Sequence, residues 1–237
     1  MIYFTGDVHR KIEGLLERLD EKQIPNTSDQ IIVLLGDVCV NYKHNMYDWF
    51  AKKILHDSGR TYFCIHGNHE MRPENIEKYK EQKWNGGIAY VENEFPNLIF
   101  AKDGEVYDLE GMKILVLGGA YSVDKPYRLE MGWNWFPDEQ IRPERREEIL
   151  SCVKELKEVD LVLSHTCPEQ WQPTDLFLPG LDQSAVDKSM EKWLSEVERN
   201  LDYKHWLFGH FHANRKINEK ATMLYEDIIS LKEVLNE

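Results

Sequence analysis

The chain has 237 residues, of which 42% are hydrophobic and 30% charged, a composition that excludes a disordered polypeptide. This length suits an α/β fold with a sizeable buried core, so we predict a single domain over residues 1–237. The formal net charge of −13 argues against non-specific nucleic-acid binding, which requires Lys and Arg to neutralise phosphates.

The N-terminus is a short apolar run that Asp7 interrupts, without the basic segment that opens a secretory signal peptide. No apolar stretch approaches the ~20 residues that a membrane helix needs. Four scattered cysteines without CxxC spacing are typical of reduced core thiols: Cys39, Cys64, Cys152 and Cys167. We therefore predict a soluble, cytoplasmic protein without a membrane partner.

Apolar runs of strand length recur along the chain and alternate with segments of helical periodicity. The runs predict strands at residues 1–5, 31–35, 61–65, 113–117, 160–164 and 204–208, and shorter strands at 88–91, 97–101, 105–108 and 221–225. The helical pattern predicts helices just after Arg10 and over residues 45–56, 138–157 and 184–198. This alternation indicates an α/β architecture with largely parallel strands and partly antiparallel additions.

Residues 118–137 interrupt this pattern. After Gly118 and Gly119, aromatic side chains follow among charges and a proline, without a clean period: Tyr121, Tyr127, Trp133, Trp135 and Phe136. We predict a long loop, and loops of this length are often functional. Its aromatic side chains either stack on a base or aryl group, or pack over a sheet edge, which is the more common role of Trp and Phe.

Five of the predicted strands end directly in polar residues that can bind metal. They lead to Asp7 and His9, to Asp37, to Asn68 and His69, to His165, and to His210 and His212. In α/β sheets ligands bind beyond the carboxyl ends of the strands, so these side chains can converge in one crevice. Carboxylate, amide and imidazole donors suit Mn, Fe or Zn and are poor for Ca.

The spacing of these residues supports convergence. Asp7 and His9 lie two positions apart and share one face of an extended chain, as do His210 and His212. Glycines precede Asp7, Asp37, Asn68 and His210, and a missing side chain lets the backbone turn sharply or approach a ligand closely. Other histidines are expected to be structural or exposed: His44, His56, His66 and His205.

In their order along the chain, these residues resemble the signature of the calcineurin-like metallophosphoesterases. The matching blocks are Asp7-Val8-His9, Gly36-Asp37, Gly67-Asn68-His69-Glu70, Ser164-His165 and Gly209-His210-Phe211-His212. Any one block occurs by chance, whereas the ordered set, from residue 5 to 212, is specific. The resemblance implies a four-layer α/β/β/α sandwich, in which two mixed sheets pack face to face and helices flank them.

The resemblance also implies a dinuclear metal centre. One ion would take Asp7, His9, Asp37 and His212, and the other Asp37, Asn68, His165 and His210. Asp37 would bridge the two ions, while His69 would face the substrate without binding metal. We expect two divalent ions, Mn²⁺ first and Fe or Zn as alternatives.

Such a centre predicts hydrolysis of a phosphate mono- or diester, with His69, Asp37 and Asn68 in catalysis. Two divalent ions roughly 3.5–4 Å apart can share one hydroxide as the nucleophile, since metals lower the pKa of bound water toward ~7. Two 2+ ions less two Asp charges leave +2 locally, which attracts phosphate despite the acidic chain. An imidazolium at His69 would protonate the leaving oxygen, with Asp7 or Asp37 favouring its charged form.

Three residues are candidates for binding the substrate: Asn68, Arg10 and Arg72. The two arginines could donate two hydrogen bonds each to a phosphate. Alternatively, Arg10 caps or decorates the first helix, and Arg72 pairs with Glu74 or Glu77. We expect Glu70 to be exposed and leave open an orienting role for it.

The sequence departs from the Ser/Thr protein phosphatase branch of this family. That branch has Gly after the Asp-x-His block and an Asp-Arg pair after Gly-Asp, where this chain has Arg10, Val40 and Asn41. The missing arginine removes a phosphate clamp, so we favour a phosphatase or phosphodiesterase of a small phosphorylated substrate. A protein phosphatase and a non-catalytic binding scaffold of the same fold are the alternatives.

Overall fold

Two β-sheets organise the chain, which the computed structural model describes over residues 1–177 and 183–235. In these ranges the first sheet has the order β13-β1-β2-β3-β6-β5-β4, built from β1 (Ile2–Thr5), β2 (Ile31–Leu34), β3 (Thr61–Cys64), β4 (Tyr79–Trp84), β5 (Gly87–Glu92), β6 (Leu98–Ala101) and β13 (Ile229–Ser230). The second has the order β11-β12-β10-β9-β8-β7, built from β7 (Val106–Leu109), β8 (Met112–Leu117), β9 (Leu161–Ser164), β10 (His205–Phe208), β11 (Arg215–Asn218) and β12 (Ala221–Met223).

Both sheets are mixed, with parallel strands at the centre. β1, β2, β3 and β6 run parallel, and β13, β5 and β4 pair antiparallel at the edges of the same sheet. β8, β9, β10 and β12 run parallel between the antiparallel edges β7 and β11. The predicted architecture of parallel strands with antiparallel additions is therefore confirmed.

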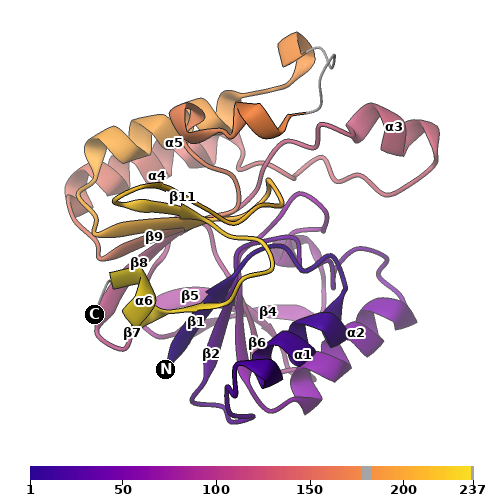
Figure 1. Ribbon diagram of the computed structural model, residues 1–237. Coiled ribbons are helices and arrows are strands. Elements are labelled where there is room, and N and C mark those ends of the chain that lie inside the picture. Colours follow the sequence, from indigo (N-terminus) through magenta and orange to yellow (C-terminus); the bar gives the residue numbers. More distant parts are fainter. Residues whose placement is uncertain (178–182, 236–237) are drawn as a thin grey trace.

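Helices cover the outer face of each sheet (Figure 1). Beside the first sheet lie α1 (Ile12–Glu21) and α2 (Met46–Asp57), and beside the second lie α4 (Pro143–Leu156) and α5 (Ser189–Asn200). The short helices α3 (Lys125–Glu130) and α6 (Leu231–Leu235) lie outside this layering, with α3 projecting at the upper right of Figure 1. Among the described residues, no helix has the length and apolar character needed to cross a membrane.

Alternation along the strands explains the four layers. In β2, Val33 points into a core that contains Leu163 and Leu207 of the second sheet, so the two sheets pack face to face. Its neighbours Ile32 and Leu34 point the other way, into a core shared with α1 and α2. A third core joins the second sheet to α4 and α5. The chain thus has the predicted α/β/β/α sandwich.

The sequence patterns missed several elements. β4 and β11 are edge strands with mostly exposed polar side chains, so neither shows an apolar alternation. β4 pairs with β5 across Asn85 and Gly86, which both have positive φ, as a two-residue hairpin requires. The short strand β13 was also unexpected.

One predicted loop and two predicted helix starts were also wrong. Residues 118–137 are not loop throughout, because α3 lies within them. The helix predicted over 138–157 begins only at Pro143, a residue suited to the first helical turn. The helix predicted over 184–198 begins at Ser189, after a separate short turn at Gln183–Ala185.

Candidate metal centre

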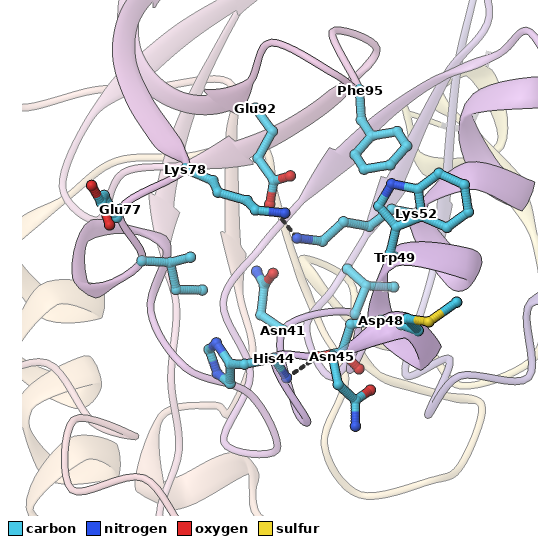
Figure 2. A pocket seen from close by; sticks show the side chains of 13 residues that line it. Asn41, His44, Asn45, Asp48, Trp49, Lys52, Glu77, Lys78, Glu92 and Phe95 are labelled. Atoms are coloured by element: carbon cyan, nitrogen blue, oxygen red, sulfur yellow. Dashed lines mark hydrogen bonds and ion pairs between the residues drawn. The ribbon is translucent and has the colours of Figure 1, made fainter.

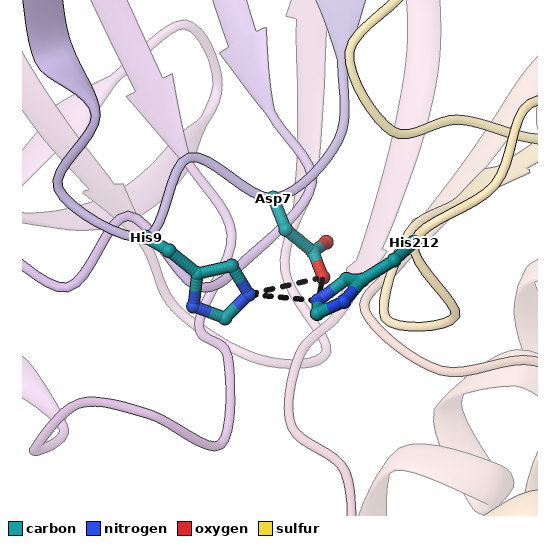
Figure 3. A group of neighbouring side chains, drawn as sticks. All are labelled: Asp7, His9 and His212. Atoms are coloured by element: carbon teal, nitrogen blue, oxygen red, sulfur yellow. Dashed lines mark hydrogen bonds and ion pairs between the residues drawn. The ribbon is translucent and has the colours of Figure 1, made fainter.

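The polar residues that follow β1, β2 and β3 meet those that follow β9 and β10 at the carboxyl ends of the central strands. His9 Nε2 lies 2.8 Å from His212 Nε2, although 203 positions separate these residues. Asp7 Oδ2 lies 3.7 Å from His9 Nε2 and 3.1 Å from His212 Nε2. Figure 3 shows these three side chains pointing toward one another. The two sheets together therefore build this half of the cluster.

The second half of the cluster surrounds His165. Its Nε2 lies 2.9 Å from Asn68 Oδ1 and 3.6 Å from Asp37 Oδ1. The His210 ring lies 5.0 Å from the His165 ring, measured between centroids. Asp37 also reaches the first half, because its Oδ2 lies 3.7 Å from His9 Nε2. All seven residues predicted to bind metal are thus brought together, with Asp37 between the halves.

Backbone N–H groups hold the two carboxylates in matching ways. The amide of His210 donates to Asp7 Oδ1 at 2.9 Å, and that of His69 donates to Asp37 Oδ1 at 2.8 Å. The glycines predicted to allow close approach make this possible. A Cβ on Gly209 would lie 2.4 Å from Asp7 Oδ1, and one on Gly67 would lie 2.1 Å from Asp37 Oδ1. In each carboxylate the second oxygen, Oδ2, lies 3.7 Å from His9 Nε2.

Backbone strain also gathers at this site, and the sequence patterns did not reveal it. Left-handed conformations occur at six non-glycine residues of the cluster and its neighbours: His9 (φ 45°), Arg10 (φ 63°), Asp37 (φ 48°), Cys39 (φ 61°), His210 (φ 68°) and His212 (φ 52°). Each costs roughly 1–2 kcal/mol in an L-residue. Such strain persists only where surrounding contacts fix it, which is typical of functional sites.

The charges within the cluster shift its pKa values strongly. Burial would raise the pKa of Asp7, but the nearby imidazoles of His212 and His9 outweigh burial and lower it. Burial would lower the pKa of His165, but Asp37 and Asp7 raise it to about 9. Burial, reinforced by His165, lowers the pKa of His210 to about 3. The buried carboxylates therefore favour a positive charge beside them.

The donors fit a divalent cation. Three groups have donor atoms within 4.8 Å of one another: Asp7, His9 and His212; His9, Asp37 and His69; and Asp7, Asp37 and His165. Asp7 Oδ2 is buried without a hydrogen-bond partner among the described residues, so it has an unused lone pair for a cation. His165 Nδ1 lies 2.8 Å from the Leu35 carbonyl, the contact that orients a metal-binding imidazole and leaves Nε2 for the metal.

His69 contacts an arginine that sequence reasoning missed. Arg128 Nη2 lies 2.7 Å from His69 Nδ1. Arg128 belongs to α3, within the segment that was predicted to be loop. Burial lowers the pKa of His69; Asp37 opposes this effect, and Arg128 adds to it. Asp37 thus favours the charged form of His69 as expected, but burial outweighs it and the net shift of the His69 pKa is downward.

The two arginines predicted to bind substrate lie in different surroundings. Arg10 Nη1 donates to Asp48 Oδ1 at 2.9 Å, and Arg10 lines a cavity of about 190 Å³ together with His69. Arg72 is buried and forms an ion pair with Asp103, so the alternative pairing with Glu74 or Glu77 was wrong. Arg72 lines a separate polar cavity of about 500 Å³, which includes none of the cluster residues among its described lining.

Glu70 and His66 are both buried. The expectation that Glu70 is exposed was wrong, because its exposed fraction is 0%. Glu70 Oε1 accepts a hydrogen bond from the Val38 amide at 3.2 Å, and burial raises its pKa to about 8. His66 is buried at the end of β3, and burial lowers its pKa well below the ordinary range. Glu70 thus supports the loop that follows Asp37.

A cleft of about 430 Å³ opens beside the cluster. Cluster residues line one part of it: Asp37, Asn68, His69, His210 and His212. Apolar side chains line another: Val123, Leu176, Phe177, Val186 and Phe211. The aromatic side chains of residues 121–136 have different surroundings: Tyr121 lines this cleft, whereas Phe136 is buried. The cleft can therefore contact both a polar and an apolar part of one ligand.

A further cavity of about 360 Å³ lies beside α2, shown in Figure 2. Its described lining contains the buried Lys52–Glu92 ion pair and the aromatic side chains Trp49 and Phe95. No residue of the Asp/His cluster belongs to that lining, so the chemistry described above lies elsewhere.

The fold and site together define an α/β/β/α protein with an Asp/His cluster able to hold metal ions. The sequence model of the calcineurin-like phosphoesterases matches residues 1–214, so the chain belongs to that family. A search of curated proteins found no match.

Solved structures share the fold at low sequence identity. The crystal structure of TT1561 of Thermus thermophilus is 14% identical, covers 95% of this chain and 89% of its own, and superposes with a TM-score of 0.52. A second crystal structure is 13% identical, with 94% and 88% coverage and a TM-score of 0.50. At these identities the likeness shows a common fold.

Proposed function

We propose that this protein hydrolyses a phosphate mono- or diester at the Asp/His cluster with two divalent metal ions. Membership of the calcineurin-like phosphoesterase family supports the reaction class. The observation that carries the proposal is the position of Asp37, whose Oδ1 faces His165 and whose Oδ2 faces His9. A carboxylate between two sets of donors is suited to join two ions.

In this proposal the ligand sets are those implied by the resemblance. Asp7, His9, Asp37 and His212 would hold one ion, and Asp37, Asn68, His165 and His210 the other. When bound, such ions supply a nucleophilic hydroxide and positive charge for the phosphate, as Mn²⁺, Fe or Zn can. Arg10 is the better placed of the two candidate arginines, because Arg72 lines a different cavity.

The surrounding residues divide the remaining work. The cleft would bind the phosphate beside Asn68 and His210 and the organic group against its apolar lining. His69 lines the same cleft, with its Nε2 3.8 Å from Asp37 Oδ2. His69 would stabilise the leaving oxygen by donating a hydrogen bond from Nε2–H as the P–O bond breaks, and the departing alkoxide would take its proton from solvent. Apolar side chains would limit competing water.

Metal reconstitution tests this function. The purified protein would be stripped of metal, reloaded with Mn²⁺ and assayed with p-nitrophenyl phosphate and its bis ester. We expect turnover that depends on Mn²⁺, with two ions bound per chain. The ratio of the monoester and diester rates would assign the protein as a phosphatase or a phosphodiesterase. Full loading without turnover of either compound would favour a non-catalytic scaffold.

A further inference from the structure

Arg128 occupies an unusual position for an arginine. Its exposed fraction is 2%, and it lies near the end of α3, against the cluster rather than in solvent. Its Nε and Nη1 have no hydrogen-bond partner among the described residues. The carboxylate of Asp124 is 3.6 Å from Nε and is itself 40% exposed. Burying a guanidinium with so few partners is costly, so folding stability by itself does not explain this placement.

The one close polar contact of the Arg128 side chain is with His69. Among the described residues, its side-chain hydrogen bond joins Nη2 to His69 Nδ1 at 2.7 Å. A guanidinium carries donors and no acceptor, so Nδ1 of His69 must be the acceptor. The ring proton of His69 is then on Nε2, the nitrogen that lies 3.8 Å from Asp37 Oδ2. The contact thus sets which nitrogen faces the reaction.

The surrounding segment fixes Arg128 in place. The Tyr42 ring lies 5.6 Å from the guanidinium carbon, in a cation–π contact. Asn134 Nδ2 donates to the Tyr42 carbonyl at 2.6 Å, and the Trp133 amide donates to the Arg128 carbonyl at 2.8 Å. The segment is therefore tied to the loop that follows Asp37 at Arg128 itself and at Asn134.

We propose that Arg128 is a positioning residue for phosphoester hydrolysis: it holds the His69 ring so that Nε2–H points to the leaving oxygen. This inference rests on the proposed function of His69. Arg128 brings a guanidinium to the site from α3, whereas Asn41 stands where the protein phosphatase branch has its arginine. Arg128 differs in role from the arginine of that branch, because its guanidinium contacts the His69 imidazole and its other nitrogens are buried.

The test compares two variants. Arg128→Met keeps a long side chain and removes the N–H donors, whereas Arg128→Lys keeps one donor nitrogen and the positive charge. Arg199→Met, on the exposed end of α5, is the matched control and should stay within about twofold of the parent. We expect Arg128→Met to keep its metal ions and lose about 10- to 100-fold in kcat on alkyl phosphates. KM should change much less, and Arg128→Lys should recover part of the loss.

A double-variant comparison shows whether Arg128 acts through His69. In a His69→Ala background, Arg128→Met should cause little further loss, because the group that it positions is gone. Equal losses with and without His69 would overturn the inference. A rise in KM with unchanged kcat would also overturn it, because that result would place Arg128 on the substrate. Loss of bound metal in Arg128→Met would indicate a structural role and overturn it too.

A spectroscopic measurement separates this inference from the proposed function. Nitrogen-15 spectra of the His69 ring in the protein loaded with diamagnetic Zn²⁺ should show a proton on Nε2 and none on Nδ1. Arg128→Met should change that pattern, whether or not the protein turns over a phosphate ester. An unchanged tautomer would contradict the inference, while absent turnover with a changed tautomer would refute only the enzymatic proposal.

Discussion

The Asp/His cluster and the segment over residues 121–136 approach the same cleft but are held by different means. In the cluster, backbone amides fix the carboxylates of Asp7 and Asp37, and the strands behind them belong to two packed sheets. In the segment, a short helix carries Arg128 to His69 through a side-chain contact. Backbone amides thus hold the two buried carboxylates in place, whereas the Arg128 side chain orients only the His69 ring.

The comparison teaches that the two regions should fail differently. A change in the cluster removes a ligand or displaces a carboxylate, so bound metal should be lost. A change in the segment leaves the carboxylates in place, so bound metal should remain while the orientation of His69 is lost. Metal content measured beside turnover therefore distinguishes the two regions.

The largest expected effect is that of Asp37→Asn. An amide lacks the charge to join two cations, so we expect at least one ion to be lost and turnover of every substrate to fall. The fall should exceed the ~10- to 100-fold usual for residues that only orient a ligand. Asp57→Asn, an exposed position that pairs with Lys53 in α2, is the control. Retention of two ions with normal turnover would remove Asp37 from the bridging role.

The next effect is that of His69→Ala. We expect the variant to keep its ions and to lose about 10²- to 10⁴-fold in kcat on esters with poor leaving groups. The loss on p-nitrophenyl phosphate should be smaller, because that leaving group needs less assistance. The donor atoms of His69, His9 and Asp37 lie within 4.8 Å of one another. A loss of metal content in this variant would therefore indicate that His69 is a metal ligand.

A smaller effect is expected from Gly67→Ala. The new Cβ would lie 2.1 Å from the backbone nitrogen and Oδ1 of Asp37, so the carboxylate must move. We expect a loss of about 1–3 kcal/mol in the free energy of unfolding, measured with denaturant, together with weaker metal binding. Gly14→Ala, in α1, where the new Cβ would meet only Arg18 Nη1 at an ordinary 3.6 Å, should instead stabilise by roughly 0.5–1 kcal/mol. Equal behaviour of both variants would contradict the close approach.

The smallest effect concerns pH and Glu191, which lines the cleft away from the carboxylates. Burial raises the pKa of Glu191, and its Oε2 has no hydrogen-bond partner in the described part of the chain. The folded state therefore holds this proton at a pH where the unfolded state has lost it, and stability falls as pH rises above the ordinary Glu range. Glu191→Gln should stabilise the protein at pH 7 by about 1–2 kcal/mol, with little effect near pH 4.

Thermal or denaturant unfolding at both pH values checks this sign. Thr166 Oγ1 donates to Glu191 Oε1 at 2.9 Å, and glutamine retains an oxygen for that bond. Glu196→Gln, an exposed position of the same helix, should change the stability little at either pH. A benefit of Glu191→Gln that is equal at pH 4 and pH 7 would show that the charge is not its cause.

Much of the fold and of the cluster was determined by the sequence itself. The continuous apolar run at Ile32, Val33 and Leu34 predicts a strand buried on both faces, and the structure places these side chains in two cores. The motif residues at the strand ends predicted a common crevice, and parallel strands bring their carboxyl ends together. Periodicity and strand-end motifs are local patterns, so a single chain displays them.

Only the tertiary structure decided the contacts that cross the chain. His69 and Arg128 are 59 positions apart, and the amide of His210 reaches Asp7 across 203 positions. No local sequence pattern predicts either contact. For Arg128, the neighbouring residues in the sequence do not indicate whether the arginine is buried or exposed. The burial of Glu70 was likewise set by packing around Val38. Local sequence specifies which elements form, while burial and partners depend on how the sheets and α3 pack.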